Sequence, residues 1–386
     1  MMYVALRMLL GDRAKYFGLI FGLTFASLVL TQQSAVFLGL MTRTFGAITD
    51  TGVADIWVMD PKVQYIDDIK PMSDTALLRV RGIEGVDWAV PLYKSLLKAR
   101  LENGNFQSVN VFGLDDATLA GGPHTMLEGR VEDLRMSDAV IVDSVGAQGK
   151  LAKPPSKPGG KPTPLHVGDS LELNDRRAVV VGICKVSRTF QSQPVLYTTY
   201  SRATTFAPHE RKMLSFILVK AKPGIAEADL CARIRERTGL EAYEKETFIE
   251  KTMGYFMKYT GIPINFGTAV ALGFVVGVAI VAQLFYSFTL ENLRYFATLK
   301  AMGASNFRLL RMILLQALLV GATGYGIGVG LASLFGYSFR DTELAFRLPW
   351  QLLLGSAGAV MVICALSAAL SLLKVVRLEP AVVFKA

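Results

Sequence analysis

The chain has 386 residues, a mean hydropathy of +0.38 and only 19% charged residues. This composition is too apolar for a soluble protein of this length, so part of the chain is expected to lie in a membrane. The net charge is +9, yet residues 41–265 hold 29 basic and 27 acidic residues, and this near-neutral balance argues against a nucleic-acid partner.

Four stretches are long enough and sufficiently free of charge to cross a membrane as helices, since about 20 residues span a hydrocarbon core of about 30 Å. These stretches are Phe17–Leu40, Phe266–Leu290, Met312–Gly336 and Gln351–Leu373. The first has 24 residues, more than the apolar part of a signal peptide, and no Ala-x-Ala site follows it. We therefore expect it to remain as an anchor.

Basic residues cluster in three short regions that flank these stretches. They are Arg7, Arg13 and Lys15; Arg294, Lys300, Arg308 and Arg311; and Lys374, Arg377 and Lys385. Only three acidic residues accompany them, so the three regions carry +7 of the net charge. The positive-inside rule then predicts a multi-pass inner (plasma) membrane protein with both termini in the cytoplasm and residues 41–265 outside.

The outer segment has the pattern of an α+β domain. Short runs rich in Val and Ile and bounded by turn residues predict strands at Ala54–Met59, Val86–Val90, Ser108–Phe112, Ala139–Val142, Ser170–Leu173, Ala178–Ile183 and Ser215–Val219. Asn103-Gly104-Asn105 predicts a hairpin turn. Helical patterns cover Ser73–Val80 and Ile225–Thr238.

Three other features of the outer segment leave alternatives open. Residues 154–162, rich in Pro and Gly, predict a surface loop, with contact to a partner as the alternative reading. Cys184 and Cys231 can pair in an oxidising compartment or lie apart as small buried residues. His124, His166 and His209 lack the spacing of metal ligands, so no metal site is expected.

The segment Glu291–Ser305 follows the second span. It has no helix breaker before Met302, after which Gly303 predicts a helix end and Ser305 the start of the next helix. Leu293, Phe296, Ala297 and Ala301 form an apolar stripe, and Glu291 can pair with Arg294. From spacing alone, an ordinary juxtamembrane helix explains the segment equally well.

This segment, read as Glu-x-x-Arg-x-x-Ala-x-Leu-Lys-Ala-x-Gly-Ala-Ser, resembles the cytoplasmic loop of MacB/FtsX-like ABC transporter permeases of the DevC, LolC and HrtB type (type VII ABC superfamily). Three further features agree and cover nearly the whole chain. They are the arrangement of one span, an insert and three spans; residues 165–183, similar to a recurrent strand pair of the family; and the tail residues 377–381.

The resemblance implies a domain plan with a cytoplasmic amphipathic N-terminus, an anchoring span, a periplasmic domain and three further spans. The expected boundaries are 1–16, 17–44 (first span and stalk), 45–262 (periplasmic domain), 263–290 (second span), 291–311 (cytoplasmic coupling helix), 312–336 (third span), 337–350 (short outer loop), 351–373 (fourth span) and 374–386 (cytoplasmic tail).

The resemblance also implies that the segment after the second span is a coupling helix that docks on a cytoplasmic ABC ATPase. Its expected docking residues are Glu291, Arg294, Ala297, Lys300, Gly303 and Ser305. The chain has no Gly-x-x-x-x-Gly-Lys-[Ser/Thr] motif, so it is expected to be a non-catalytic permease subunit without a fused ATPase. No cofactor is expected in the chain, and ATP and Mg would bind to a separate ATPase homodimer.

Small and polar residues inside the spans predict helix contacts. Glycine repeats at 18/22, 273/277, 324/328 and 326/330 allow close approach of backbones, either inside the bundle or between two copies of a homodimer. Gln283 and Gln316 are expected to bond between helices. Gln32, Gln33, Met253 and Phe256 are candidate substrate contacts, with an aromatic belt as the favoured reading of the last two.

Two functions remain open at this point. The first is an efflux or extraction permease that couples ATP hydrolysis to periplasmic motion (mechanotransmission) and exports a hydrophobic or amphipathic substrate through a periplasmic adaptor and an outer-membrane channel. The second is an FtsX-like transmembrane signal transducer that controls a periplasmic hydrolase. No paired carboxylates, metal cluster or nucleophile with its base is evident for an intramembrane enzyme.

Overall fold

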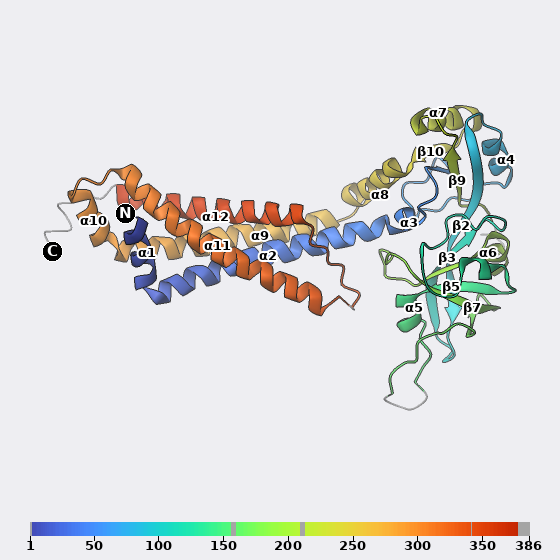
Figure 1. Cartoon of the computed structure of the whole chain (residues 1–386), viewed down its shortest axis with the longest axis horizontal. Helices are drawn as coiled ribbons and strands as arrows, with labels where there is room; N and C mark the ends of the chain where they lie inside the picture. Colours follow the sequence, from blue (N-terminus) through green and yellow to red (C-terminus); the bar gives the residue numbers. More distant parts are fainter. Residues whose placement is uncertain (1, 156–159, 209–212, 341, 377–386) are drawn as a thin grey trace. The chain divides into compact units, whose positions relative to one another are not determined.

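The computed structural model describes residues 2–155, 160–208, 213–340 and 342–376. The described chain forms two compact units, a membrane unit of residues 1–40 and 261–386 and an inserted domain of residues 41–260 (Figure 1). The tail motif at 377–381 and the middle of the Pro/Gly-rich loop, residues 156–159, lie outside the described residues.

Four long helices make up most of the membrane unit. They are α2 (Arg13–Thr44), α9 (Ile262–Glu291), α11 (Asn306–Ser338) and α12 (Trp350–Val376). In the described part of the chain these are the helices long and apolar enough to cross a membrane. The prediction of one span followed by three after an insert is therefore confirmed.

Glycines bring α2 against two other spans. A Cβ added at Gly324 or Gly328 of α11 would lie 2.7 Å from Leu23 Cβ or 2.6 Å from Ser27 Cβ of α2. Similarly, Gly273 and Gly277 of α9 face Val29 and Ala26 of α2 at 2.8 and 2.7 Å. By contrast, nothing lies within 4 Å of the added Cβ at Gly326 or Gly330. Gly18 and Gly22 of α2 also face α9, at 3.7 and 3.0 Å from side chains of that helix. The repeats at 18/22, 273/277 and 324/328 thus serve packing inside the bundle, and the one at 326/330 faces outward.

Polar side chains also link the helices of this unit. The buried Gln316 of α11 donates from Nε2 to the carbonyl of Ala5, 2.8 Å away, in the short N-terminal helix α1 (Met2–Gly11). This confirms the predicted interhelical bond of Gln316. Gln283, however, is exposed on α9 and has no hydrogen bond among the described residues, so the same prediction for Gln283 is wrong within a single copy.

The inserted domain is built on one mixed sheet with the strand order β10-β1-β9-β2-β3-β8-β5-β7-β4, and β6 pairs with β2 and β7. The strands are β1 (Ile56–Met59), β2 (Val86–Arg100), β3 (Phe106–Leu114), β4 (Thr125–Glu128), β5 (Ala139–Asp143), β6 (Ser170–Leu173), β7 (Arg176–Lys185), β8 (Val195–Thr199), β9 (Phe216–Ala221) and β10 (Glu241–Glu244). The helices are α3 (Gly46–Asp50), α4 (Thr75–Arg81), η1 (Val131–Arg135), α5 (Ser144–Gln148), α6 (Tyr200–Phe206), α7 (Glu227–Thr238) and α8 (Lys245–Tyr259). An α+β insert between the first two spans is confirmed.

One long strand, β2, joins two halves of this sheet. Residues up to Leu92 pair with β9, and residues from Tyr93 onward pair with β3. We call β1, β9 and β10 with α4, α7 and α8 the terminal half, and β3 to β8 with α5, α6 and η1 the middle half. Strand β2 therefore pairs with the terminal half along its first part and with the middle half along the rest.

Two tight turns have the backbone that their residues predict. Gly104 has φ +83° in the β2–β3 hairpin, which confirms the predicted turn. In the β6–β7 hairpin Asn174 and Asp175 have φ +45° and +62°, as a two-residue type I′ turn requires. Asn and Asp tolerate this region better than other side chains.

Cys184 and Cys231 are unpaired and buried in the inserted domain, which answers the open question of their pairing. Burial raises the pKa of each thiol to about 12. At pH 7.5 about one thiol in 30,000 is then ionised, compared with about one in ten for an ordinary cysteine. Since the thiolate is the reactive form, we expect maleimide to label neither residue in the folded protein and both in denaturant. Rapid labelling of Cys184 in the native protein would contradict this packing.

Candidate functional site

The segment after the second span forms a short helix between two breaks. Helix α10 (Leu293–Ala301) is separated from α9 by Asn292, whose Nδ2 donates to the Phe288 carbonyl at 2.9 Å. The segment therefore does not form one unbroken helix from Glu291 to Met302. At the break the Phe288 carbonyl accepts both the Asn292 side chain and the Asn292 backbone N–H, which lies 3.1 Å away. At the other end Gly303 has φ +90° and ends the helix as predicted.

The two faces of α10 have different environments. Phe296 and Ala297 are fully buried in the core of the membrane unit, and Leu293 packs against that core. Tyr295 and Met302 are 62% and 71% exposed, and Arg294 also faces outward. The apolar stripe thus anchors the helix to the bundle, while the opposite face remains accessible.

The expected docking residues divide between these environments. Glu291, Arg294, Gly303 and Ser305 are exposed, and Lys300 is half-buried. Ala297 faces the core, so its methyl group lies away from the accessible surface. The exposed Tyr295 and Met302 were not singled out from the sequence, although the helical period places Tyr295 opposite the buried stripe.

Glu291 pairs with a residue far away in the chain. Its carboxylate forms an ion pair with Lys15 at the start of α2, and Lys15 Nζ also lies 3.6 Å from Asp12. The predicted pair with Arg294 is not present among the described ion pairs, which makes that expectation wrong. The Lys15 pair joins the end of α9 to the beginning of α2.

Ser305 takes the position expected of it, before the first residue of α11. Its backbone is extended, and its carbonyl accepts from the Arg308 N–H at 2.9 Å. No side-chain capping bond is present at this residue. Helix α10 is thus set between two fixed changes of direction.

A cavity of about 560 Å³ lies next to this segment. It is lined by Tyr3, Arg7, Met8, Gly11, Asp12, Glu291, Asn292 and Tyr295. Its walls come from α1, the beginning of α2 and the Asn292 break, and the guanidinium of Arg7 lies over the Tyr3 ring at 5.0 Å. The accessible side of α10 therefore borders a cavity whose lining includes both basic and acidic side chains.

The candidate substrate contacts lie in different places. Gln32 and Gln33 are half-buried on α2 in the membrane unit. On α8 of the inserted domain, Met253 is exposed, whereas Phe256 is 6% exposed and packs against Tyr65, Phe190 and Tyr255. The ring of Phe256 is thus part of an aromatic cluster, and substrate contact by these four residues stays a prediction.

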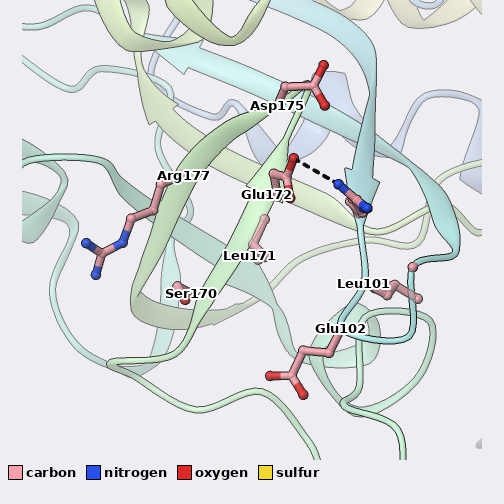
Figure 2. A pocket seen from close by; sticks show the side chains of 9 residues that line it. Leu101, Glu102, Ser170, Leu171, Glu172, Asp175 and Arg177 are labelled. Atoms are coloured by element: carbon pink, nitrogen blue, oxygen red, sulfur yellow. Dashed lines mark ion pairs between the residues drawn. The ribbon is translucent and has the colours of Figure 1, made fainter.

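A shallow cavity of about 520 Å³ in the inserted domain offers a second place for a site (Figure 2). It lies between the β2–β3 and β6–β7 hairpins and is lined by Arg100, Leu101, Glu102, Gly104, Ser170, Leu171, Glu172, Asp175 and Arg177. Arg100 and Glu172 approach each other to 3.7 Å across it. Both side chains are exposed and their charges offset each other. The accessible face of α10 is therefore the stronger candidate for a functional site.

Among the described residues, no group of three His, Cys, Asp or Glu side chains could hold a metal ion.

Two family models together match most of the chain. The model described as MacB-like periplasmic core domain matches residues 17–237, and the one described as FtsX-like permease C-terminal matches residues 267–380. Uncharacterized ABC transporter permeases from two strains of Mycobacterium tuberculosis are 26% identical over 371 residues, which covers 95% of this chain and 93% of theirs.

Solved structures similar to this chain include two domains from ABC-type transporters. The periplasmic region of MacB from Actinobacillus actinomycetemcomitans is 17% identical, with a TM-score of 0.37, and the match covers 54% of this chain and 95% of that one. The extracellular domain of the noncanonic ABC-type transporter YknZ from Gram-positive bacteria is 14% identical, with a TM-score of 0.34, over 50% of this chain and 100% of that one. The family models, matching residues 17–237 and 267–380, show that this chain belongs to the ABC transporter permeases of the MacB/FtsX type.

Proposed function

We propose that this permease couples ATP hydrolysis by a separate cytoplasmic ATPase to movement of its inserted domain. The observation that carries the proposal is the arrangement of α10, with Phe296 buried in the helical bundle and Arg294, Tyr295 and Met302 accessible on the opposite face. A partner bound to the accessible face would be mechanically connected to the spans through the buried one. The family supports an ATPase as this partner.

The two breaks suit α10 to transmit force. Asn292 and Gly303 interrupt the backbone on either side of it, so α10 can tilt as one rigid body between α9 and α11. The ion pair of Glu291 with Lys15 extends the connection to α2. In this proposal closure of the ATPase displaces α10, and three spans receive the displacement directly.

The proposed membrane orientation follows from charge. By the positive-inside rule, the basic regions flanking the spans favour a cytoplasmic position for α10 and both termini. The inserted domain would then lie in the periplasm or outside the cell. This orientation gives the ATPase access to α10.

A second copy of the chain is the proposed partner within the membrane. Gln283 lies in a stripe of exposed residues on α9 with Leu272, Val276 and Ile280. An amide facing lipid costs free energy, and an amide from another copy would satisfy it. We therefore place the homodimer seam along this face of α9.

The proposed cargo is a hydrophobic or amphipathic molecule, exported by way of a periplasmic adaptor and an outer-membrane channel. Exposed Met253, Met257 and Tyr259 give α8 an apolar, adaptable surface in support of this class. The competing function is a signal transducer controlling a hydrolase. It predicts the same ATPase coupling without net movement of an apolar compound, so transport of a fluorescent lipid analogue into adaptor-containing fractions distinguishes the two.

The test of the coupling proposal uses two substitutions at the accessible segment. Lys300→Glu reverses a charge on α10, and Gly303→Val forces a β-branched side chain into a backbone with φ +90°, which costs at least about 1–2 kcal/mol. Both are expected to abolish the stimulation of the copurified ATPase in nanodiscs while leaving membrane insertion intact.

A matched control for Gly303→Val is Gly326→Val, since Gly326 has open space around it and no positive φ. This variant should keep full stimulation. If Lys300→Glu and Gly303→Val leave the ATPase rate unchanged, docking at this segment is refuted.

A further inference from the structure

The loop between β7 and β8, residues Val186–Pro194, contacts the helices at both ends of the inserted domain; we call it the bridging loop. At α3, which follows α2, the Asp50 carboxylate accepts from the Ser187 N–H at 2.7 Å and from the Ser187 hydroxyl at 3.0 Å. A carboxylate that accepts two hydrogen bonds from one residue fixes both the position and the orientation of that residue.

Two more residues near α3 complete this attachment. Arg43 Nη1, in the last turn of α2, donates to Ser192 Oγ at 3.1 Å. Gly46 allows the close approach, because a Cβ added there would lie 2.8 Å from the Ser187 Cβ. In addition, the Gly52 N–H donates at 3.2 Å to Nε2 of His124, another residue of the middle half.

The same loop reaches α8, the helix that precedes the second span. Phe190 packs against Phe256 with ring centroids 4.8 Å apart. Phe256 is held in turn by Tyr65 and Tyr255, whose own rings stack at 4.3 Å. The bridging loop thus touches the chain just after it leaves the first span and just before it enters the second.

The bridging loop is also braced within the middle half. Thr189 Oγ1 donates to the Gln193 carbonyl at 3.1 Å and accepts from the Gln193 N–H at 2.8 Å. Asn110 of β3 donates from Nδ2 to Gln193 Oε1 at 3.1 Å, and Lys150 Nζ donates to the Ser192 carbonyl at 2.9 Å. A displacement applied to the loop would therefore be passed to strand β3 and to the chain after α5.

The two halves share strand β2 and one buried core. Strand β2 changes its partner from β9 to β3 between Leu92 and Tyr93. Beside it, Phe216 and Phe248 of the terminal half belong to the same buried cluster as Phe112 of the middle half. Apolar packing of this kind is non-directional, whereas the hydrogen bonds of the bridging loop fix its orientation on α3. The loop therefore adds a directional attachment to a core that the two halves already share.

We propose that the bridging loop delivers the movement of α2/α3 and α8 to the middle half of the inserted domain, with Asp50, Ser187 and Phe190 as its positioning residues. This inference rests on the proposed function, since it needs an ATP-driven movement to deliver. It adds a directional route by which that movement spreads within the domain, beside the shared core.

The test measures two distances by electron spin resonance in the full-length permease with its copurified ATPase in nanodiscs. One spin-label pair joins the membrane unit to α8 (Glu343→Cys with Glu250→Cys), and the other joins it to the β2–β3 hairpin (Glu343→Cys with Asn105→Cys). The labelled positions are exposed, whereas the native cysteines are buried. Labelled protein is diluted with unlabelled protein so that each distance is read within one copy.

The variant carries Asp50→Ala and Phe190→Ala, and its matched control carries Asp115→Ala. Asp115 likewise accepts one N–H and one hydroxyl hydrogen bond, both from Thr118, but it lies in the loop after β3 and touches neither α3 nor α8 through these bonds. We expect vanadate trapping to shift both distances in the unsubstituted background and in the control. In the variant the α8 shift should persist, which also reports a folded protein, and the hairpin shift should fall by at least half.

A full hairpin shift in the double variant would overturn the inference while leaving the proposed function intact. Absence of both shifts in the unsubstituted background would overturn the proposed function and the inference together. As a second variant, Gly46→Leu would press against Ser187 from the other side, and it should reduce the hairpin shift in the same way.

Discussion

Gly328→Leu should destabilise the membrane unit by about 1–3 kcal/mol, because it overpacks a contact between two spans. The added Cβ would lie 2.6 Å from the Ser27 Cβ and 2.8 Å from the Thr24 carbonyl oxygen, so the backbones of α2 and α11 would have to separate. Gly324→Leu acts at the same interface, where the Leu23 Cβ lies 2.7 Å away. The measurement is thermal unfolding of the detergent-solubilised protein, followed by loss of folded monomer or dimer on size exclusion.

The matched controls for this prediction are Gly326→Leu and Gly330→Leu in the same helix. Each leaves open space around the new side chain, and removal of a helical glycine favours the helix by about 0.5–1 kcal/mol. These variants should unfold at or above the native temperature. Equal destabilisation at all four glycines would show that α11 does not pack on α2 with this face.

Phe296→Ala should separate ATPase binding from its mechanical effect. The Phe296 ring is fully buried in the core of the membrane unit, and truncation of a buried phenylalanine costs about 3–5 kcal/mol. Here the lost packing free energy weakens the attachment of α10 to the helical bundle. The ATPase should still copurify, while the vanadate-induced shift of the inserted domain is lost; spin-label distances and copurification measure the two effects.

The neighbouring residue gives the reciprocal control. Tyr295 is exposed on the opposite side of α10, so Tyr295→Ala should weaken ATPase copurification and leave the thermal stability of the membrane unit unchanged. Phe296→Leu, which keeps an apolar side chain in the core, should restore most of the shift. If Phe296→Ala transmits the movement fully, the buried face of α10 is not the mechanical connection.

Much of the fold is predictable because the decisive signals are local. The spans follow from uninterrupted apolar runs, and the β2–β3 hairpin follows from Asn103-Gly104-Asn105. Strands β4, β8 and β10 were not predicted, and each is stabilised by pairing with a strand distant in the chain. Strand β10 pairs with β1, almost 200 residues earlier in the sequence. Tertiary pairing of this kind leaves no pattern in the strand itself.

The candidate site shows the same division between local and distant causes. The end of α10 is predictable because Gly303 itself favours a helix end. The inward position of Phe296 is predictable from helical spacing. By contrast, Glu291 forms its ion pair with Lys15 rather than with the nearby Arg294, because the beginning of α2 lies close to the end of α9. The break at Asn292 coincides with a bond from its side chain to the Phe288 carbonyl, and the sequence alone does not distinguish this residue from one in a continuing helix.

The contacts of the bridging loop were not foreseen for a related reason. Ser187, Phe190 and Ser192 lie in a short polar connection between strands and form no recognisable motif. Their partners are more than 60 residues away along the chain, in α2, α3 and α8. Covariation between positions 43–50 and positions 187–192 among related sequences is the signal that could have indicated this attachment.

Site-specific photocrosslinking tests the central claim, ATPase docking at α10, most directly. A benzophenone side chain replaces Met302, which is 71% exposed at the end of α10, and in a control it replaces Leu331, which is 43% exposed on α11 within a span. The membranes are illuminated and the crosslinked products identified by mass spectrometry. The account predicts a permease–ATPase product from position 302 and none from position 331. A permease that copurifies with its ATPase but gives no such product from position 302 would contradict it.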